Sequence, residues 1–330
     1  MLRATVALLL TAGVFVLGVA PPAMADPGED QGTPASLTEK LANASRGYLD
    51  AKAKLERSQQ RQAALKADLS TVETDLGART EAVQELARAA YRAGTLNSVV
   101  SILDSGSPTT FLDRLTLLDQ IAADQRRTVT DLVDTRDRIT KAKAAIDREV
   151  AEQRKQLTVM NQRKEDAERA LRAAGGGQTT GRVTGSGSAT ATQAPRNADG
   201  SWPSQSCSVN DPTTSGCITP RLLHAYQQAR GAGFTRHTAC WRSGGTGEHP
   251  KGRACDFAAE KNGFGGVATG GDRTYGNNLA AYFIRNANRL GVLYVIWFRQ
   301  IWLPSSGWRS YSGRGSPSAE HTNHVHLSVY

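Results

Sequence analysis

The long stretch between Leu37 and Leu171 constrains the fold more than any other feature of this 330-residue chain. Its only proline is Pro108, and the good helix formers Ala, Leu, Glu, Gln, Lys and Arg dominate its composition. Apolar residues recur at spacings of three, four and seven, which is typical of helices that pack along one narrow stripe. The two apolar series are Leu37, Leu41, Tyr48, Leu55, Leu65, Leu69, Val72, Leu76, Val83, Leu86 and Ala90, and then Val129, Leu132, Ile139, Ile146, Val150, Leu157, Met160 and Leu171.

A break in the middle of this stretch predicts that the chain turns back on itself. Gly94 ends the first series, and Ser105-Gly106-Ser107-Pro108 interrupts the chain before the second series begins. We therefore predict an all-α coiled-coil hairpin over residues 36–173, with arms of about 50 residues that reach roughly 75 Å at the helical rise. The more apolar segment 97–118 forms the tip, which either closes the end of the hairpin or docks a partner.

Residues 1–25 are typical of a secretory signal peptide. Arg3 supplies a positive charge, Ala4 to Ala20 form an apolar run, and Ala23-Met24-Ala25 fits a cleavage site before Asp26. The alternative is an uncleaved membrane anchor, although glycines and prolines interrupt the run. We expect a secreted, extracellular protein.

Basic charge is concentrated in the C-terminal half. Residues 26–173 hold 24 basic and 24 acidic residues, whereas residues 174–330 hold 15 and 7. This excess predicts an anionic partner such as peptidoglycan or another wall polymer, and therefore association with the cell wall. Nucleic acid is disfavoured by the export signal and by the lack of a recognition motif. Residues 174–200, rich in Gly, Ser and Thr, are predicted to be a flexible linker to a domain over 202–330.

Four cysteines, Cys207, Cys217, Cys240 and Cys255, all come after this linker. An even count in an exported domain favours two disulfides. Three pairings are open, and we favour Cys207 with Cys217 and Cys240 with Cys255 because each pair is close in sequence. A four-thiolate zinc site is the alternative, but the short C-x-x-C spacing is missing.

Two short alternating segments carry the candidate chemistry. In a strand, successive side chains point to opposite faces, so His324 and His326 share one face of the final segment. The segment Ala254–Ala258 alternates likewise and turns Asp256 away from its apolar neighbours. Together with His249, these strands can supply a three-ligand set, His249, Asp256 and His326, for a catalytic Zn²⁺ with one position open to water.

His324 is the best-placed general base, because it lies two residues from a ligand on the same face, and His321 is a weaker candidate. The alternative is that the His-x-His strand is only a polar surface. Three tryptophans, Trp297, Trp302 and Trp308, are expected in the core or at its rim, or else stacked on sugar rings.

At these residues the sequence resembles metallopeptidases that include D-alanyl-D-alanine carboxypeptidases, dipeptidases and murein endopeptidases. Their pattern is S-x-H-x-x-G-x-A-x-D with a histidine ligand later in the chain. The matching residues are His249, Gly252, Ala254 and Asp256. The terminal His321-x-x-His324-x-His326 is similar to the murein endopeptidase version, in which the last histidine binds zinc.

The resemblance also assigns a role to Arg242, which resembles the arginine beside the scissile carbonyl in these peptidases. Two positions depart from the pattern: Gly247 stands where the peptidases have serine, and Asn323 where the dipeptidases have a catalytic glutamate. A mechanism that uses this glutamate is therefore not expected here, and His324 would have to serve as the base.

Over nearly all of 202–330 the sequence resembles the ARB-07466-like C-terminal domain of secreted actinobacterial and fungal proteins. The resemblance implies an α+β domain with a small antiparallel sheet, LAS metallopeptidase-like, and helices near Thr219–Arg230 and Asn277–Leu290. The residues that carry it are Gly216-Cys217-Ile218-Thr219-Pro220-Arg221, Val295-Ile296-Trp297, Gly307-Trp308-Arg309 and His324-Val325-His326.

The helical half, including Tyr91-Arg92-Ala93-Gly94, resembles coiled-coil regions of secreted peptidoglycan hydrolases. That resemblance implies docking on a membrane division complex through the coiled-coil tip. The leading hypothesis is a secreted zinc peptidase that cuts peptidoglycan stem peptides or cross-links. The alternatives are a non-catalytic wall-binding module and a coiled-coil activator or scaffold of another hydrolase.

Overall fold

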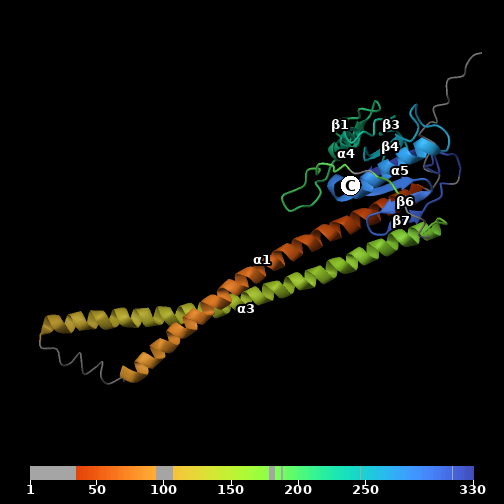
Figure 1. Cartoon of the computed structure of the whole chain (residues 1–330). Coiled ribbons are helices and arrows are strands. Elements are labelled where there is room, and N and C mark those ends of the chain that lie inside the picture. Colours follow the sequence, from red (N-terminus) through yellow and green to blue (C-terminus); the bar gives the residue numbers. More distant parts are fainter. Residues whose placement is uncertain (1–34, 94–106, 178–182, 187–188, 246, 314) are drawn as a thin grey trace, which may run out of the picture.

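The computed structural model describes residues 35–93, 107–177, 183–186, 189–245, 247–313 and 315–330. A helical hairpin extends away from a smaller α+β domain (Figure 1). This arrangement confirms the predicted fold class. The predicted signal peptide and residues 97–106 of the predicted tip lie outside the described residues. Within those residues, no helix has the length and apolar character needed to cross a membrane.

The hairpin consists of α1 (Ala35–Ala93) and α3 (Pro108–Ala173), which run antiparallel and cross along their length (Figure 1). Polar pairs fix their register: Arg61 lies 2.9 Å from Glu149, and Arg79 lies 2.7 Å from Asp131. Both helices, at 59 and 66 residues, are longer than the predicted arms. Ser107 caps α3 by accepting a hydrogen bond from the Thr110 amide.

The C-terminal domain is built on one six-stranded sheet in the order β3-β4-β8-β5-β6-β7, and every neighbouring pair is antiparallel. Its strands are β3 (Thr238–Ala239), β4 (Ala254–Ala258), β5 (Val292–Trp297), β6 (Gln300–Leu303), β7 (Gly307–Ser310) and β8 (His324–Val329). A separate hairpin pairs β1 (Val209–Asn210) with β2 (Cys217–Ile218). The helices are α4 (Pro220–Gly231), α5 (Gly270–Arg285) and α6 (Ala287–Leu290).

One face of this sheet packs against α4 and α5. Phe257, Val325 and Leu327 point to this face and join Leu222 and Phe283 in one buried cluster. Trp297 belongs to the same core and is fully buried, as one of the sequence interpretations expected. The predicted second helix begins earlier than expected, because α5 starts at Gly270 and is succeeded by the separate turn α6.

The hairpin covers part of the opposite face. We call residues 37–50 of α1 and 167–173 of α3 the hairpin base. Leu41 and Leu171 of the base are buried in a cluster with Tyr294, Ile296 and Ile301 of β5 and β6. Since these residues bury apolar area on both partners, the domain and the hairpin base share one core.

Polar contacts add to this junction. Arg46 of α1 lies 2.5 Å from Glu248, and the Tyr330 hydroxyl donates to Asp50 at 2.7 Å. The Glu248 side chain is 2% exposed, so this ion pair is largely desolvated.

The segment predicted to be a flexible linker is packed over its second half. The Ala191 amide donates to the Asn286 side chain at 2.9 Å, and the Ala194 amide donates to the Arg289 carbonyl. Ala191 itself is buried. The His224 ring contacts the Thr192 carbonyl at 3.0 Å. Composition predicted a flexible segment here because it does not show these contacts, whose partners lie more than 30 positions away in the sequence.

Both predicted disulfides are present. Cys207 bonds to Cys217, and Cys240 bonds to Cys255. The second bond joins the residue after β3 to β4. Closing a loop of this size is worth about 3 kcal/mol in the chain-entropy model.

Candidate metal centre

The pairing of β4 with β8 brings two of the predicted ligands together. Asp256 lies directly opposite His326 in the ladder, and His324 lies opposite Ala258. His326, His324 and Asp256 therefore share one face, as the alternation of side chains predicted. On the next strand, β5, Ile296 lies opposite His326 and points to this same face. Ile296 packs against the hairpin base, so the hairpin covers the part of the face beside the site.

His249 completes the group from the loop before β4. Its Nε2 lies 3.2 Å from Nδ1 of His326 and 3.2 Å from Oδ2 of Asp256. Nδ1 of His326 lies 2.8 Å from Oδ1 of Asp256. Ligands of a tetrahedral zinc ion are about 3.3 Å apart, given bonds near 2 Å. One donor atom from each of the three residues lies within 4.8 Å of the others, so this group is one that could hold a metal ion.

The outer nitrogens of both imidazoles have partners that set their orientation. Nδ1 of His249 contacts the Cys240 carbonyl, and Nε2 of His326 lies 2.8 Å from the Ser328 hydroxyl. The Tyr294 ring stacks on His326 with an interplanar angle of 6°. Such contacts leave one nitrogen of each ring facing the site, which is the usual arrangement around ligating histidines.

The loop between His249 and β4 requires glycine at position 252. Its φ is +66°, and an added Cβ would lie 2.6 Å from Sγ of Cys207 and 2.7 Å from Cα of Ile218. No side chain fits there, and the positive φ disfavours other residues. The glycine therefore sets the close approach of the His249 loop to β2.

Burial determines the protonation states in this site. Burial alone raises the pKa of Asp256, but the neighbouring His249 and His324 and the hydrogen bonds from imidazole lower it well below its usual range. Burial lowers the pKa of His324 to about 4, opposed by Asp256, and also lowers the pKa of His326. At neutral pH Asp256 is therefore a carboxylate and His324 and His326 are neutral; a carboxylate and a neutral imidazole are the forms that bind metal.

Arg242 lies against the ligand carboxylate. Its Nη1 is 2.8 Å from Oδ2 of Asp256, and its side chain is 19% exposed, more than any triad side chain. The guanidinium offsets the buried negative charge. It also occupies one carboxylate oxygen, so a metal bound here would share Asp256 with the arginine.

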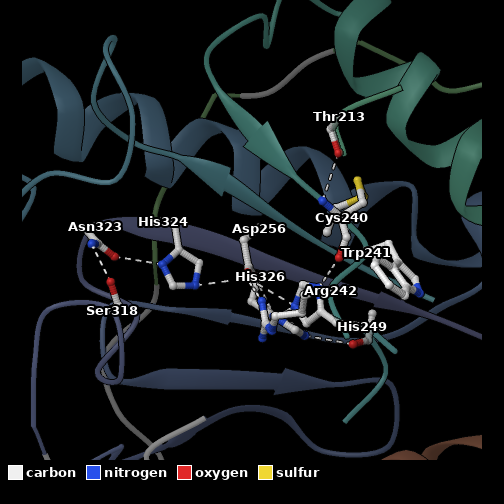
Figure 2. A network of polar contacts seen from close by, with 12 residues as sticks. Thr213, Cys240, Trp241, Arg242, His249, Asp256, Ser318, Asn323, His324 and His326 are labelled. Atoms are coloured by element: carbon white, nitrogen blue, oxygen red, sulfur yellow. Dashed lines mark hydrogen bonds and ion pairs between the residues drawn. A yellow bond between two sulfur atoms is a disulfide. The ribbon is translucent and has the colours of Figure 1, made fainter. Parts of the chain in front are cut away.

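His324 is oriented by Asn323, a role that the sequence did not reveal. The Asn323 amide nitrogen donates to the Gly265 carbonyl and to the Ser318 hydroxyl, both at 2.9 Å. Its oxygen must therefore face Nδ1 of His324, 2.7 Å away, and accept that proton. Figure 2 shows this row of residues leading towards Asp256.

The consequence is an imidazole with an unprotonated Nε2 directed at the site. Nε2 of His324 is buried, has no hydrogen-bond partner among the described residues, and lies 3.5 Å from Oδ1 of Asp256. Buried polar atoms without partners are rare and call for an explanation. A water or a substrate proton beside the triad would supply the missing partner.

His321 lies farther from the ligands. Its ring centroid is 4.7 Å from that of His324 and 5.6 Å from that of His326. Its Nδ1 contacts the Ala319 carbonyl, its Nε2 is buried with no hydrogen-bond partner in the described part of the chain, and its φ is +50°. The structure thus brings the two predicted accessory histidines to one side of the triad, with His324 the nearer to Asp256.

An antiparallel sheet with His, Asp and His donors converging on one face defines a candidate metal-binding domain. Residues 214–322 match the family model for the VldE C-terminal domain. The match includes His249, Asp256 and Arg242 and ends just before β8. Neither a curated protein nor a solved structure matches this chain.

Proposed function

We propose that this protein is a secreted zinc peptidase that cuts stem peptides or cross-links of peptidoglycan. The triad of His249, Asp256 and His326, with the buried Nε2 of His324 beside it, is the observation that carries the proposal. Three imidazole and carboxylate ligands with a fourth position open are the ligand set of catalytic zinc. The two disulfides and the basic C-terminal half suit an extracellular location and an anionic polymer.

When bound, zinc supplies Lewis acidity, which polarises a carbonyl and lowers the pKa of water towards about 7. The side chains then divide the remaining work. As a water oxygen adds to the scissile carbonyl carbon, His324 would accept a proton from that water at Nε2. It would pass this proton to the amine as the C–N bond breaks, while Asn323 keeps Nδ1 protonated. Arg242 would hold the carbonyl oxygen of the scissile bond as negative charge develops there.

Substrate approaches from the Arg242 side of the site in this proposal. The triad residues are at most 1% exposed, and the hairpin base occupies the neighbouring part of the same face. The loop residues Ser243, Gly244 and Gly245, directly after Arg242, are exposed. Arg242 is thus the site residue that a wall peptide meets first.

The first test is the metal content of the purified, oxidised protein over residues 26–330, together with its action on purified peptidoglycan. We expect about one zinc per chain and the release of new amino groups without new reducing sugars. Both should disappear in His326→Ala, whereas His224→Ala, a change on α4 outside the triad, should retain both. Zinc binding without release of amino groups or sugars would reject the peptidase and leave a metal-stabilised domain.

A second candidate is a non-catalytic wall-binding module, and the Arg242–Asp256 ion pair favours it. An arginine at 2.8 Å from the ligand carboxylate can replace a metal as the counter-charge of Asp256. In that case the metal-free protein binds peptidoglycan as strongly as the zinc-loaded protein. A peptidoglycan pull-down with and without chelator measures this difference.

Docking of the hairpin on a membrane division complex also stays a proposal. The start of α3 exposes Phe111, Leu112 and Leu117, with 37%, 61% and 56% of their surfaces accessible. Apolar residues gathered at one end of a helix suit contact with a partner. This would make the hairpin the element that positions the domain.

A further inference from the structure

A small cavity lies at the junction between the hairpin base and the domain, away from the triad. Its volume is about 220 Å³, and Arg46, Arg221 and Arg253 line it together with Trp202 and Tyr330. None of the described residues that line it is acidic. Arg46 is paired with Glu248 at 2.5 Å, so Arg221 and Arg253 are the cations that favour an anion in the cavity.

Arg221, at the start of α4, is the most buried of the three, with 2% exposure. Its Nη1 donates to the Tyr330 main-chain oxygen and its Nη2 to the Pro203 carbonyl, the latter at 2.8 Å. Its Nε has no hydrogen-bond partner among the described residues. Burial, opposed by Tyr330 and reinforced by repulsion from Arg253, lowers the pKa of Arg221 to about 10.

The other two arginines come from different elements. Arg46 belongs to α1, and while its Nη2 contacts Glu248, its Nε is also buried without a described hydrogen-bond partner. Arg253 precedes β4 and uses Nη2 to donate to the Gln205 carbonyl at 3.2 Å. Unsatisfied N–H groups of a buried guanidinium are costly, so two of them beside one cavity indicate a ligand that accepts hydrogen bonds.

We propose that this cavity binds a phosphate group. A tetrahedral oxyanion with two negative charges can accept from several guanidinium groups at once, and arginine forks match its geometry. A carboxylate offers only two oxygens in one plane and one charge, which suits three converging cations less well. The phosphate would belong either to free inorganic phosphate or to a wall polymer that carries a phosphate monoester, since a backbone phosphodiester has only one charge and two free oxygens.

Binding there ties the hairpin base to the domain. Arg46 is contributed by α1, whereas Arg221 and Arg253 are contributed by the domain. A ligand held by all three stabilises the docked arrangement by RT ln(1 + c/Kd), where c is the free ligand concentration, and this stabilisation rises with the logarithm of c once c exceeds Kd. Arg46 also contacts Glu248, the residue before His249, so the phosphate site adjoins the loop of the candidate metal centre.

Calorimetric titration of the chain over residues 26–330 with inorganic phosphate tests the proposal, and it does not depend on peptidase activity. We expect one site per chain, with affinity about tenfold or more weaker in Arg253→Gln and in Arg46→Gln, because each loses a charge-assisted hydrogen bond. Arg285→Gln removes an arginine of α5 that does not line this cavity and should bind as the parent does. Circular dichroism confirms that each variant is folded.

Titrations with other ligands distinguish phosphate from carboxylate and free phosphate from a phosphate-bearing polymer. Acetate binding as tightly as phosphate would overturn the preference for a phosphate group. Inorganic phosphate binding while a glycerol phosphate oligomer that ends in a phosphate monoester does not would assign the site to the free ion, and binding of both would assign it to the polymer as well. Absence of binding by the parent, or equal affinity in Arg253→Gln and Arg285→Gln, would overturn the site itself.

Discussion

Oδ1 of Asp256 and Nδ1 of His326 lie 2.8 Å apart at directly opposed positions of β4 and β8. The backbone ladder, rather than a flexible loop, therefore sets the separation of two of the three candidate ligands. Ligands on rigid strands lose little freedom on binding a metal, because they are already ordered. The third ligand, His249, is held by the contact of its ring with the Cys240 carbonyl.

Replacing Asp256 by Asn keeps the size of the side chain and removes its charge. We expect metal affinity to fall by at least about tenfold, since a neutral amide is a weaker ligand than a carboxylate. Arg242 then also loses its 2.8 Å ion-pair partner. Competition with a zinc-binding dye measures the affinity. An unchanged affinity would remove Asp256 from the ligand set.

Asn323→Ala should affect proton transfer more than metal binding. The substitution frees Nδ1 of His324 to exchange its proton with Nε2, so the base is in the wrong tautomer for part of the time. We expect hydrolysis to fall about 10- to 100-fold at unchanged zinc content. Loss of zinc together with activity would show that Asn323 supports the ligands instead. Ser318→Ala, which removes only one partner of Asn323, should have a smaller effect.

The stability of the metal-free protein should decrease as the pH falls from about 6.5 to about 4, because the buried histidines resist protonation. Burial lowers the pKa of His324 to about 4 and lowers the pKa values of His321 and His326 as well. The unfolded chain, whose histidines have a pKa near 6.5, binds protons in this range that the folded chain does not. Urea unfolding in the presence of chelator at several pH values measures the free energy of unfolding. A rise in that energy towards pH 4 would contradict the assignment of neutral histidines.

Leu41→Ala should destabilise the domain although Leu41 belongs to the hairpin. Leu41 is fully buried against β5 and β6, and removing such a side chain costs about 2–5 kcal/mol. All five tryptophans lie in the C-terminal half, so their fluorescence reports the unfolding of that domain. Leu157→Ala is the matched control, because Leu157 is 47% exposed and should shift the transition by less than about 0.5 kcal/mol. An unshifted tryptophan transition in Leu41→Ala would mean that hairpin and domain unfold independently.

The parts of the fold that the sequence predicted are those governed by local pattern. The spacing of apolar residues indicated the hairpin, the alternation around Asp256 and His326 indicated a shared face, and the short separations indicated both disulfides. In each case the residues that decide the structure are neighbours in sequence or recur with a fixed period.

The parts that were not predicted depend on residues far apart in the chain. Arg46 and Glu248 are separated by 202 positions, and nothing in either local sequence indicates their contact. Asn323 was interpreted as the loss of a glutamate, but its two hydrogen-bond acceptors, Gly265 and Ser318, make it the residue that orients His324. Residues 189–200 were predicted to be part of a flexible linker from their composition. Composition does not reveal that the distant Asn286 side chain accepts a hydrogen bond from the Ala191 amide.

The disulfide between Cys240 and Cys255 has a consequence for the candidate metal centre. Cys255 directly precedes Asp256, and the Cys240 carbonyl contacts the ring of His249. One covalent bond thus links β4, which carries Asp256, to the residue whose carbonyl orients the His249 ring. A reduced chain would therefore lack a covalent link between the Asp256 strand and the group that orients His249. Under the proposed secretion, this link would form in the oxidising conditions outside the cytoplasm.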